Sequence, residues 1–414
     1  MQMSNQEYKT LKRIMHEDSS NSRHENNKVL AKQRRRDISA YKSGIYLRTG
    51  ELFYVVPQEL SILNEKVLRL ERKISQLWRN LPTIALGSYI RDLIIQEVEF
   101  TNQIEGVRST RKEIENALEY FEQGSSFPAA KRFREFAGLY LHLTEGTIQP
   151  PKTPADIRSI YDKVMDGELE EKDQLDGKLF RKNSVEVFKG HNLIHEGVNP
   201  EAEIVNMLQS MIDMLEDESV PALYSSVLSH FIFEYIHPFY DGNGRTGRFL
   251  LALYLSTPLS IATTLSLSRT IAESLDVYYR VFEEVEHPLN HGDATIFLIE
   301  MFRLIRTAQE SLERELEAKR IVLEAGEAIL PDMNLRNGTE QKIVHALFQV
   351  YLFGTYPLLS LDQLADYLSC SKATARRHLS SLEEAGMVRT LSQKPLRFAL
   401  TDESFEVLAN GEDE

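Results

Sequence analysis

The chain has 414 residues, a formal net charge of -14 at pH 7 and a single cysteine, Cys370. This length exceeds what one hydrophobic core usually supports, so two or three domains are expected. The acidic balance argues against a protein that binds polyanions over its whole surface, and one cysteine excludes an intramolecular disulfide framework.

The N-terminus and the most apolar segment argue against export and against a membrane anchor. Residues 1–20 lack the apolar core of a signal peptide. Residues 249–267 are the most apolar stretch, but Pro258 and several Ser and Thr residues interrupt it, which favours a buried helix over a membrane span. With the lone cysteine, these features predict a cytoplasmic protein without a membrane segment.

Residues 1–40 are interpreted as a polar leader. It contains a basic run formed by Lys32, Arg34, Arg35 and Arg36. Basic runs in polar termini are usually solvated, so we expect this leader to be a mobile arm and not a docking site.

Residues 41–150 are expected to form an N-terminal helical domain. A long amphipathic helix is indicated by apolar residues at helical spacing, namely Leu60, Leu63, Val67, Leu70, Ile74 and Leu77. A second helical stripe runs from Leu93 and ends at Glu105, where Gly106 suits the left-handed residue that often closes a helix.

Residues 151–320 are expected to form the central domain. Thr153 is a suitable N-cap for its first helix, and Pro154 fits the first helical position. Residues 181–198 contain alternating valines before a glycine-containing turn, a pattern typical of a β-hairpin. His191 and His195 in this hairpin could form a metal pair, but no Cys or third ligand lies nearby, so we do not favour a metal site.

Residues 237–248, with the sequence HPFYDGNGRTGR, place a base, a carboxylate, a glycine loop and two arginines in one turn. They follow a helical stripe that comprises Val227, Leu228, Phe231, Ile232, Tyr235, Ile236 and Phe239. Gly242, Asn243 and Gly244 can adopt positive φ and turn backbone N–H groups outward, just before an apolar run that starts at Phe249 and suggests a second helix. Such a loop at a helix N-terminus suits phosphate binding.

The side chains of this loop fit nucleotide chemistry. Asp241 is a hard oxygen ligand suited to Mg²⁺, and Arg245 and Arg248 lie one helical turn apart, where both could hold phosphate oxygens. The glycines also satisfy GxGxxG, but that fingerprint must follow a strand and this loop follows a helix. A Walker A loop is absent because no lysine occupies the required position.

The segment resembles the signature of the Fic family, HPFx[D/E]GNGRxxR, at every specified position. The resemblance implies a mainly helical fold and transfer of AMP from ATP to a Ser, Thr or Tyr hydroxyl of a target protein. It implies that His237 is the base, that Asp241 holds Mg²⁺ and that Arg248 binds the terminal phosphates. Asn243 and the loop amides would stabilise charge on the α-phosphate. The implied nucleotide-binding residues of the loop are Gly242, Asn243, Gly244, Arg245, Thr246, Gly247 and Arg248.

Other segments extend this resemblance. Residues 101–106, TNQIEG, are similar to the inhibitory signature [S/T]xxxE[G/N] of self-restrained family members, which implies that Glu105 binds Arg248 and leaves ATP in an unproductive pose. The hairpin resembles the family's flap, which aligns a target by strand addition. Looser similarity suggests that Tyr278, Tyr279 and Asn290 meet the nucleotide, although a Tyr pair on an amphipathic helix is as often ordinary core.

Residues 339–414 resemble a winged helix-turn-helix domain, after a loop near residues 331–338. Basic residues stand where such a domain meets DNA, namely Lys372, Arg376, Arg377, Lys394 and Arg397. Four acidic residues dilute this patch, so we favour a protein-interaction or dimer-supporting role over DNA binding.

The sequence therefore predicts a mainly α protein with a Fic-type helical bundle, a small β-hairpin flap and a C-terminal winged helix-turn-helix domain. The predicted function is that of a self-inhibited protein adenylyltransferase using ATP and Mg²⁺. Three alternatives stay open: removal of AMP by the same site with Glu105 orienting water, transfer of another phosphate-containing group, and a transcriptional regulator that senses nucleotide.

Overall fold

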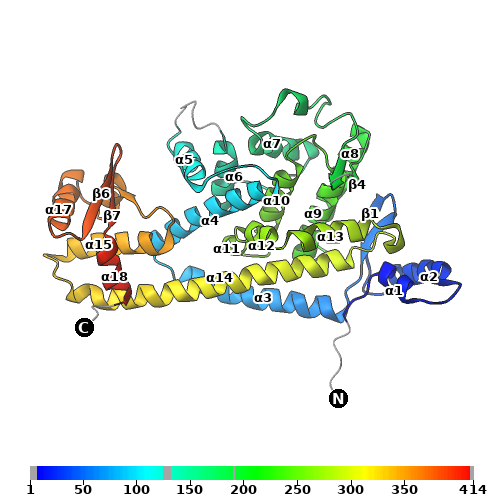
Figure 1. Ribbon diagram of the computed structural model, residues 1–414, viewed down its shortest axis with the longest axis horizontal. Coiled ribbons are helices and arrows are strands. Elements are labelled where there is room, and N and C mark those ends of the chain that lie inside the picture. The colour runs from blue at the N-terminus through cyan, green and yellow to red at the C-terminus, as the bar shows by residue number, and fades with distance from the viewer. Residues whose placement is uncertain (1–6, 125–131, 190–191, 411–414) are drawn as a thin grey trace, which may run out of the picture. The chain divides into compact units, whose positions relative to one another are not determined.

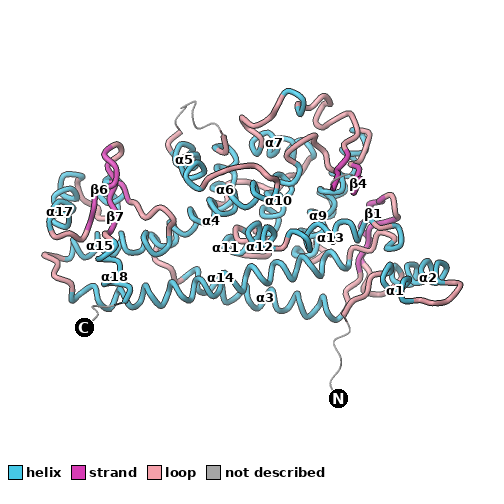
Figure 2. Tube along the Cα trace, viewed as in Figure 1, coloured by secondary structure: helices cyan, strands magenta, loops and turns pink. Residues whose placement is uncertain are grey.

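The computed structural model describes residues 7–124, 132–189 and 192–410 of the chain. The fold is mainly helical, and the described residues form three small antiparallel sheets (Figure 2). Packing divides the chain into two compact units. The first unit consists of Met1–Arg72 and Ile94–Glu310, and the second consists of Lys73–Leu93 and Ser311–Glu414. The predicted mainly helical fold class is confirmed.

The first unit contains two strand hairpins and most of the helices (Figure 1). Its elements are α1 Leu11–Glu17, α2 Arg23–Arg35, β1 Tyr41–Leu47, β2 Gly50–Tyr54, α5 Arg111–Glu122, α6 Arg134–Thr144, α7 Pro154–Val164, the short 3-10 helix η2 Glu171–Asp173, β3 Glu186–Lys189, β4 Asn192–Glu196, α8 Glu201–Glu216, α9 Ala222–Ile236, α10 Asn243–Leu255, α11 Ile261–Thr264, α12 Leu267–Glu273, α13 Leu275–Glu286 and η3 Pro288–Asn290. Three longer helices contribute residues to both units, namely α3 Gln58–Arg79, α4 Thr83–Ile104 and α14 Thr295–Ile329.

Helices α9 and α10 are the best-buried helices of the first unit. Nearly every residue of both is buried. Helix α9 is mostly apolar, whereas α10 also buries the polar residues Asn243, Arg245, Thr246 and Arg248. Helix α9 packs against α8 and α10, and α10 also packs against α7 (Figure 1). The loop that joins α9 to α10 is therefore supported at both ends by well-packed helices.

Local signals read from the sequence are confirmed in this unit. Thr153 caps α7 in a reciprocal capping box with Asp156, and Pro154 occupies the first helical turn. The predicted hairpin is formed by β3 and β4, with residues 190–191 of its turn outside the described residues. Helix α4 ends as expected, with Gly106 at φ 68° and the N–H of Val107 donating to the Asn102 carbonyl at 2.9 Å.

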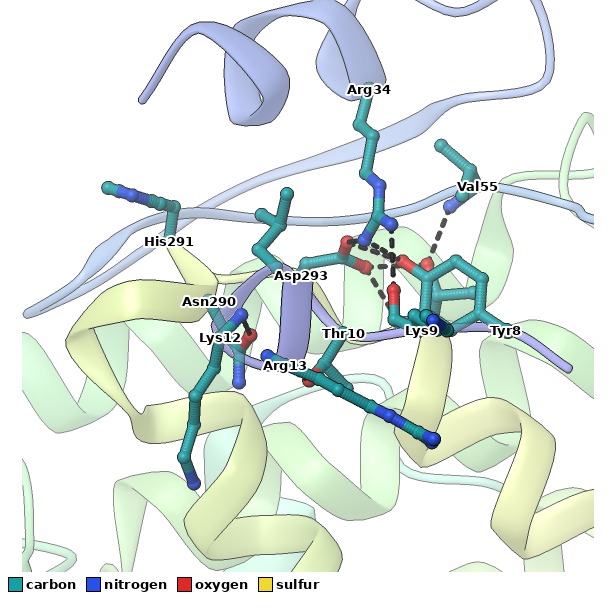
Figure 3. A network of polar contacts seen from close by, with 12 residues as sticks. Tyr8, Lys9, Thr10, Lys12, Arg13, Arg34, Val55, Asn290, His291 and Asp293 are labelled. Carbon is teal, nitrogen blue, oxygen red and sulfur yellow. Dashed lines mark hydrogen bonds and ion pairs between the residues drawn. The ribbon is translucent and has the colours of Figure 1, made fainter. Parts of the chain in front are cut away.

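The expectation of a mobile leader is wrong for the described residues 7–40. They form α1 and α2, and Arg34 of the basic run makes an ion pair of 2.9 Å with Asp293, whose side chain is 2% exposed. Tyr8 donates its hydroxyl proton to the same carboxylate at 2.6 Å, as Figure 3 shows. Burial, followed by the charge of Asp293, raises the pKa of Tyr8. A buried carboxylate far along the chain, which sequence periodicity does not reveal, thus holds this segment in place.

The second unit contains the helix-turn-helix segment. Its elements are η4 Leu330–Asp332, α15 Gly338–Phe353, β5 Leu359–Ser360, α16 Leu361–Tyr367, α17 Lys372–Glu384, β6 Val388–Gln393, β7 Leu396–Leu400 and α18 Asp402–Asn410. Helices α16 and α17 form the helix-turn-helix, and β5, β7 and β6 form the adjoining sheet in that order. This is the predicted winged arrangement.

The second unit also includes residues 73–93, which were expected to belong to the N-terminal domain. The backbone N–H of Ala85 donates to the Gln349 side chain at 3.1 Å, and the Tyr89 ring packs edge-on against Phe353 at 5.8 Å. These contacts join segments more than 260 positions apart, so local sequence patterns could not place residues 73–93 in this unit.

Across the described residues, no helix combines the length and the apolar content that crossing a bilayer requires.

Candidate active site

The loop between α9 and α10 has a defined backbone shape. His237 ends α9 in the left-handed conformation, with φ 50° and ψ 61°, and Gly242 precedes α10 at φ 79°. The Asn243 side chain closes the loop, because its Oδ1 accepts from the Phe239 N–H at 2.9 Å and its Nδ2 donates to the Phe239 carbonyl at 2.8 Å. Asn243 therefore shapes the loop, and its direct contact with a phosphate stays a prediction.

The N-terminus of α10 has the character of an anion site. No side chain caps it, while the Gly242 N–H donates to the Asp241 carboxylate at 2.7 Å. First-turn N–H groups lack partners within a helix and lie at the positive end of its dipole. A Cβ atom at Gly244 would lie 2.1 Å from Oε1 of Glu105, so the Glu105 carboxylate already lies beside this N-terminus.

The structure brings Glu105 and Arg248 together, as the resemblance implied. Arg248 is 3% exposed, and its Nη2 donates to Oε1 of Glu105 at 2.7 Å. Thr101 completes the contact, since its hydroxyl accepts from Nε at 2.7 Å and its carbonyl from Nη2 at 3.1 Å. Burial lowers the pKa of Arg248 and the charge of Glu105 raises it, with a net upward shift. The guanidinium is therefore charged and is bound to Glu105 and Thr101.

His237 is oriented as a base. Its Nδ1 lies 3.3 Å from the backbone carbonyl of Glu234. A carbonyl only accepts, so this contact assigns the proton to Nδ1 and leaves Nε2 free to take a proton. Burial, and then the neighbouring His195, lower the pKa of His237, which favours the neutral imidazole.

A polar cluster that sequence reasoning missed lies near Arg248. Burial raises the pKa of Glu234 to about 8 against the opposing charge of Arg248. A Cβ atom at Gly247 would lie 2.1 Å from Oε1 of Glu234, so Gly247 permits this close packing. The expected nucleotide contact of Gly247 stays a prediction. A glutamate inside the apolar run of α9 was the available signal for the cluster.

Arg181 is a second residue that sequence reasoning missed. It is 0% exposed and donates to the backbone carbonyls of His237 and Val198, each at 2.8 Å, and of Asn183 at 2.7 Å. A cation at the carboxyl end of a helix satisfies carbonyls that have no helical partner. Arg181 thus ties the base of the β3–β4 hairpin to the backbone of His237.

Arg245 and Thr246, which were expected to bind phosphate, are buried and make contacts within the protein, and their phosphate roles stay a prediction. Arg245 is 2% exposed, and its Nη1 lies 3.1 Å from both carboxylate oxygens of Glu168. Its charge is already matched in a buried site, so it anchors the loop to the segment after α7. Thr246 is 0% exposed, and its N–H donates to the Gly242 carbonyl at 3.1 Å.

Asp241 has the surroundings expected of a Mg²⁺ ligand. It is exposed, and one of its oxygens accepts from Gly242. Among the residues that the structure describes, no group of three or more acidic, His or Cys side chains could hold a metal. Mg²⁺ commonly uses one or two carboxylates and completes its shell with waters and substrate phosphates, so a single exposed aspartate fits.

The three residues expected near the nucleotide base differ in how exposed their side chains are. Tyr278 is 2% exposed and its hydroxyl lies 2.7 Å from Nε2 of His230, which makes it a core residue. Asn290 is also buried, and its amide donates to the Glu284 carbonyl and accepts from the Lys12 N–H, so its expected nucleotide contact stays a prediction. Tyr279 is 38% exposed. Burial, followed by the charge of Glu105, raises its pKa to about 12, and its nucleotide contact stays a prediction.

Comparisons with known families match two segments of the chain. Residues 151–255 match the model of the Fic/DOC family, a range that includes the β3–β4 hairpin, α9, α10 and the loop between them. Residues 352–392 match the model of the IclR helix-turn-helix domain. The chain therefore has a mainly helical Fic fold with small sheets and a C-terminal helix-turn-helix domain.

Individual proteins are similar over different lengths. A 53-residue segment is 40% identical to a probable protein adenylyltransferase of Aquifex aeolicus, over 13% of this chain and 17% of that protein. A Fic family protein from Desulfovibrio desulfuricans aligns with a TM-score of 0.50 and 20% identity, over 84% of this chain and 98% of that chain. A Fic domain containing signaling protein from Bacteroides thetaiotaomicron aligns with a TM-score of 0.42 and 19% identity, over 61% of this chain and 94% of that chain.

Proposed function

We propose that this protein is a protein adenylyltransferase that transfers AMP from ATP to a hydroxyl group of a target protein, and that Glu105 restrains it. One observation carries the proposal. A base with a free Nε2, an uncapped helix N-terminus and a buried arginine meet around the loop 237–248. The match of residues 151–255 to the Fic/DOC family and the distant adenylyltransferase relative support it.

The proposed reaction is a displacement at the α-phosphate. The target hydroxyl gives its proton to Nε2 of His237, and its oxygen bonds to the α-phosphorus. The bond from that phosphorus to the oxygen bridging the α- and β-phosphates breaks, and pyrophosphate leaves. Such transfers depend on positioning and on stabilisation of charge. The first-turn N–H groups of α10 supply donors, and Arg248 supplies a cation for the terminal phosphates.

Asp241 is the residue that would hold Mg²⁺ in this scheme. The ion would neutralise phosphate charge as pyrophosphate leaves. Its remaining ligands would be water and phosphate oxygens, which agrees with the exposure of Asp241.

Restraint by Glu105 follows from two of its contacts. The carboxylate engages Nη2 of Arg248, and it lies beside Gly244 at the N-terminus of α10. A bound polyphosphate would need both the cation and the N–H groups, and the negative charge of Glu105 would repel it. Catalysis then requires that Glu105 move away.

The β3–β4 hairpin is proposed to receive the target. It is a two-stranded antiparallel sheet, so its strands have edges that no other described strand covers. An extended target segment can add to such an edge through main-chain hydrogen bonds. Recognition of this kind places a hydroxyl near His237 without reading much of the target's sequence.

Intact mass tests the proposal directly. Wild type, Glu105→Gly and the double variant Glu105→Gly with His237→Asn are incubated with ATP and Mg²⁺. We expect Glu105→Gly to gain AMP units, and the double variant to gain none while it still binds ATP, since asparagine tolerates the left-handed conformation but does not act as a base. If Glu105→Gly binds ATP but never gains AMP on itself or on lysate proteins, the proposed function is wrong.

A further inference from the structure

His195, on strand β4, is a second imidazole close to the proposed base. Its ring centroid lies 6.0 Å from that of His237 and 5.4 Å from that of Tyr235. The side chain is 9% exposed, and its Nε2 is buried without a hydrogen-bond partner among the residues that the structure describes. Leaving a buried nitrogen without a hydrogen bond is unfavourable, so its placement beside the reacting loop requires a physical reason.

Glu286 of α13 fixes the orientation of this ring. Its Oε2 lies 2.8 Å from Nδ1 of His195. Because a carboxylate accepts, this contact places the proton of the neutral imidazole on Nδ1. The Nε2 atom then presents a lone pair, so it can accept one hydrogen bond.

The backbone of β4 is irregular where it carries His195. Val187 pairs with His195, and the next residue of β3, Phe188, pairs with Leu193. One residue of β4 is therefore extra at this point. Bulges of this kind re-aim side chains and occur often beside active sites.

We propose that His195 recognises the acceptor segment, by accepting at Nε2 a hydrogen bond from an N–H or O–H group of the peptide next to the hydroxyl that receives AMP. The inference rests on the proposed adenylyltransferase function and adds a specificity residue to it. Strand addition at the flap reads main chain, whereas a fixed side-chain acceptor reads a donor at one position. Since Nε2 is already desolvated and its ring is held by Glu286, the peptide's donor satisfies it at a small additional ordering cost.

A metal-binding role for His195 has no support in the described residues, because no cluster of three ligating side chains includes it. Direct replacement of His237 as the base is also disfavoured, since only His237 belongs to the loop that leads into the N-terminus of α10. Peptide recognition uses the one feature of His195 that other contacts leave unexplained, its unpaired Nε2.

The test compares variants in the Glu105→Gly background on an array of peptides containing Ser, Thr or Tyr, with ATP and Mg²⁺. His195→Phe keeps a ring but removes the acceptor. We expect KM for the preferred peptides to rise about fivefold, which corresponds to about 1 kcal/mol, the size of one neutral hydrogen bond, with a smaller change in kcat. The differences in KM among the peptides should also become smaller. His195→Gln, whose Oε1 can occupy the position of Nε2, should restore most of both.

His142→Phe is the matched control. It makes the same change at a partly exposed imidazole of α6, which lies 3.5 Å from Glu145, and it should leave the peptide profile unchanged. If His195→Phe and the parent have the same KM and profile, or if His195→Gln is as impaired as His195→Phe, the inference is overturned while the adenylyltransferase function stands. If the parent adds AMP to itself or to lysate proteins but to no peptide, this inference is overturned and the proposed function stands; if it adds AMP to none of them, both are overturned.

Discussion

Arg248 is the residue on which both the proposed reaction and its restraint depend. Its neighbour in the motif, Arg245, is paired with Glu168 in a buried site, so Arg248 is the arginine of the motif that a phosphate can compete for. The competitor, Glu105, has a side chain that is 33% exposed. An exposed carboxylate can leave its partner and be hydrated, which makes this contact reversible.

Replacement of Glu105 measures the strength of the restraint. The structure shows a single charge-assisted hydrogen bond between Arg248 and Glu105, and Thr101 accepts two further hydrogen bonds, from Nε and Nη2. Such a bond is worth about 1.5–3 kcal/mol, and partial exposure reduces it. We therefore expect Glu105→Gly to raise the rate of AMP transfer on the order of tenfold.

The control for this change is Gln103→Gly, which loosens the same last turn of α4 at an exposed position. It should not raise the rate. Equal rates in wild type and Glu105→Gly would show that Glu105 is an ordinary helix end and not a restraint.

At the scale of elements, the important junction is the end of α9. There the chain turns through the left-handed conformation of His237 into the loop, and the base of the β3–β4 hairpin packs against the turn. Arg181 joins the two, since it donates to carbonyls on both sides. The flap and the proposed base are thus positioned by one buried cation.

Replacing Arg181 should uncouple these elements. Arg181→Met keeps much of the volume but leaves buried carbonyls without donors, at about 1–3 kcal/mol each. We expect the free energy of unfolding to fall by roughly 3 kcal/mol and AMP transfer to fall more than ATP binding does. Denaturant unfolding and single-turnover transfer measure the two effects. Lys182→Met, at the exposed neighbouring position, should change neither, and a wild-type transfer rate in Arg181→Met would contradict the positioning role.

At the scale of the whole molecule, the two compact units do not follow the chain order. Residues 73–93 belong with residues 311–414, whereas sequence reasoning places a boundary near residue 339. A deletion after Arg336 therefore removes packing partners of Ala85 and Tyr89.

Truncation after Arg336 should destabilise the remaining chain. It uncovers the buried Tyr89 ring and removes Gln349, the acceptor for the Ala85 N–H. Exposing a large buried side chain and losing its aromatic contact costs on the order of 3 kcal/mol. We expect a lower melting temperature in thermal unfolding, and a smaller shift of the same sign for Phe353→Ala in the full chain. An unchanged cooperative melt would show that the sequence-based boundary is the better one.

The helix-turn-helix segment is proposed to support contacts with protein more than with DNA. Lys372 is paired with Asp362 at 2.8 Å, and the guanidinium of Arg376 lies 5.5 Å from the centre of the Phe398 ring. We expect retention on duplex DNA to be weak, with almost no dependence on salt. A slope of about -0.9 per phosphate contact, in a plot of log affinity against log salt, would establish DNA binding instead.

The sequence by itself determined the features that depend on neighbours in the chain. The loop 237–248, the capping box at Thr153, the stop at Gly106 and the hairpin after Arg181 follow from turn, cap and period rules that act over a few residues. The Fic-type fold was expected from the resemblance of residues 237–248 to the family signature, which is one continuous segment.

Only the tertiary structure decided which of these residues are available. Arg245 and Arg248 look equivalent in sequence, yet their carboxylate partners lie 77 and 143 positions away and give them opposite roles. The surroundings of Asn290 and of Arg34 likewise depend on long-range contacts, with the Lys12 N–H and with Asp293. The burial of a side chain and the pairing of its charge arise from packing between distant segments, so a local pattern of residues does not predict them.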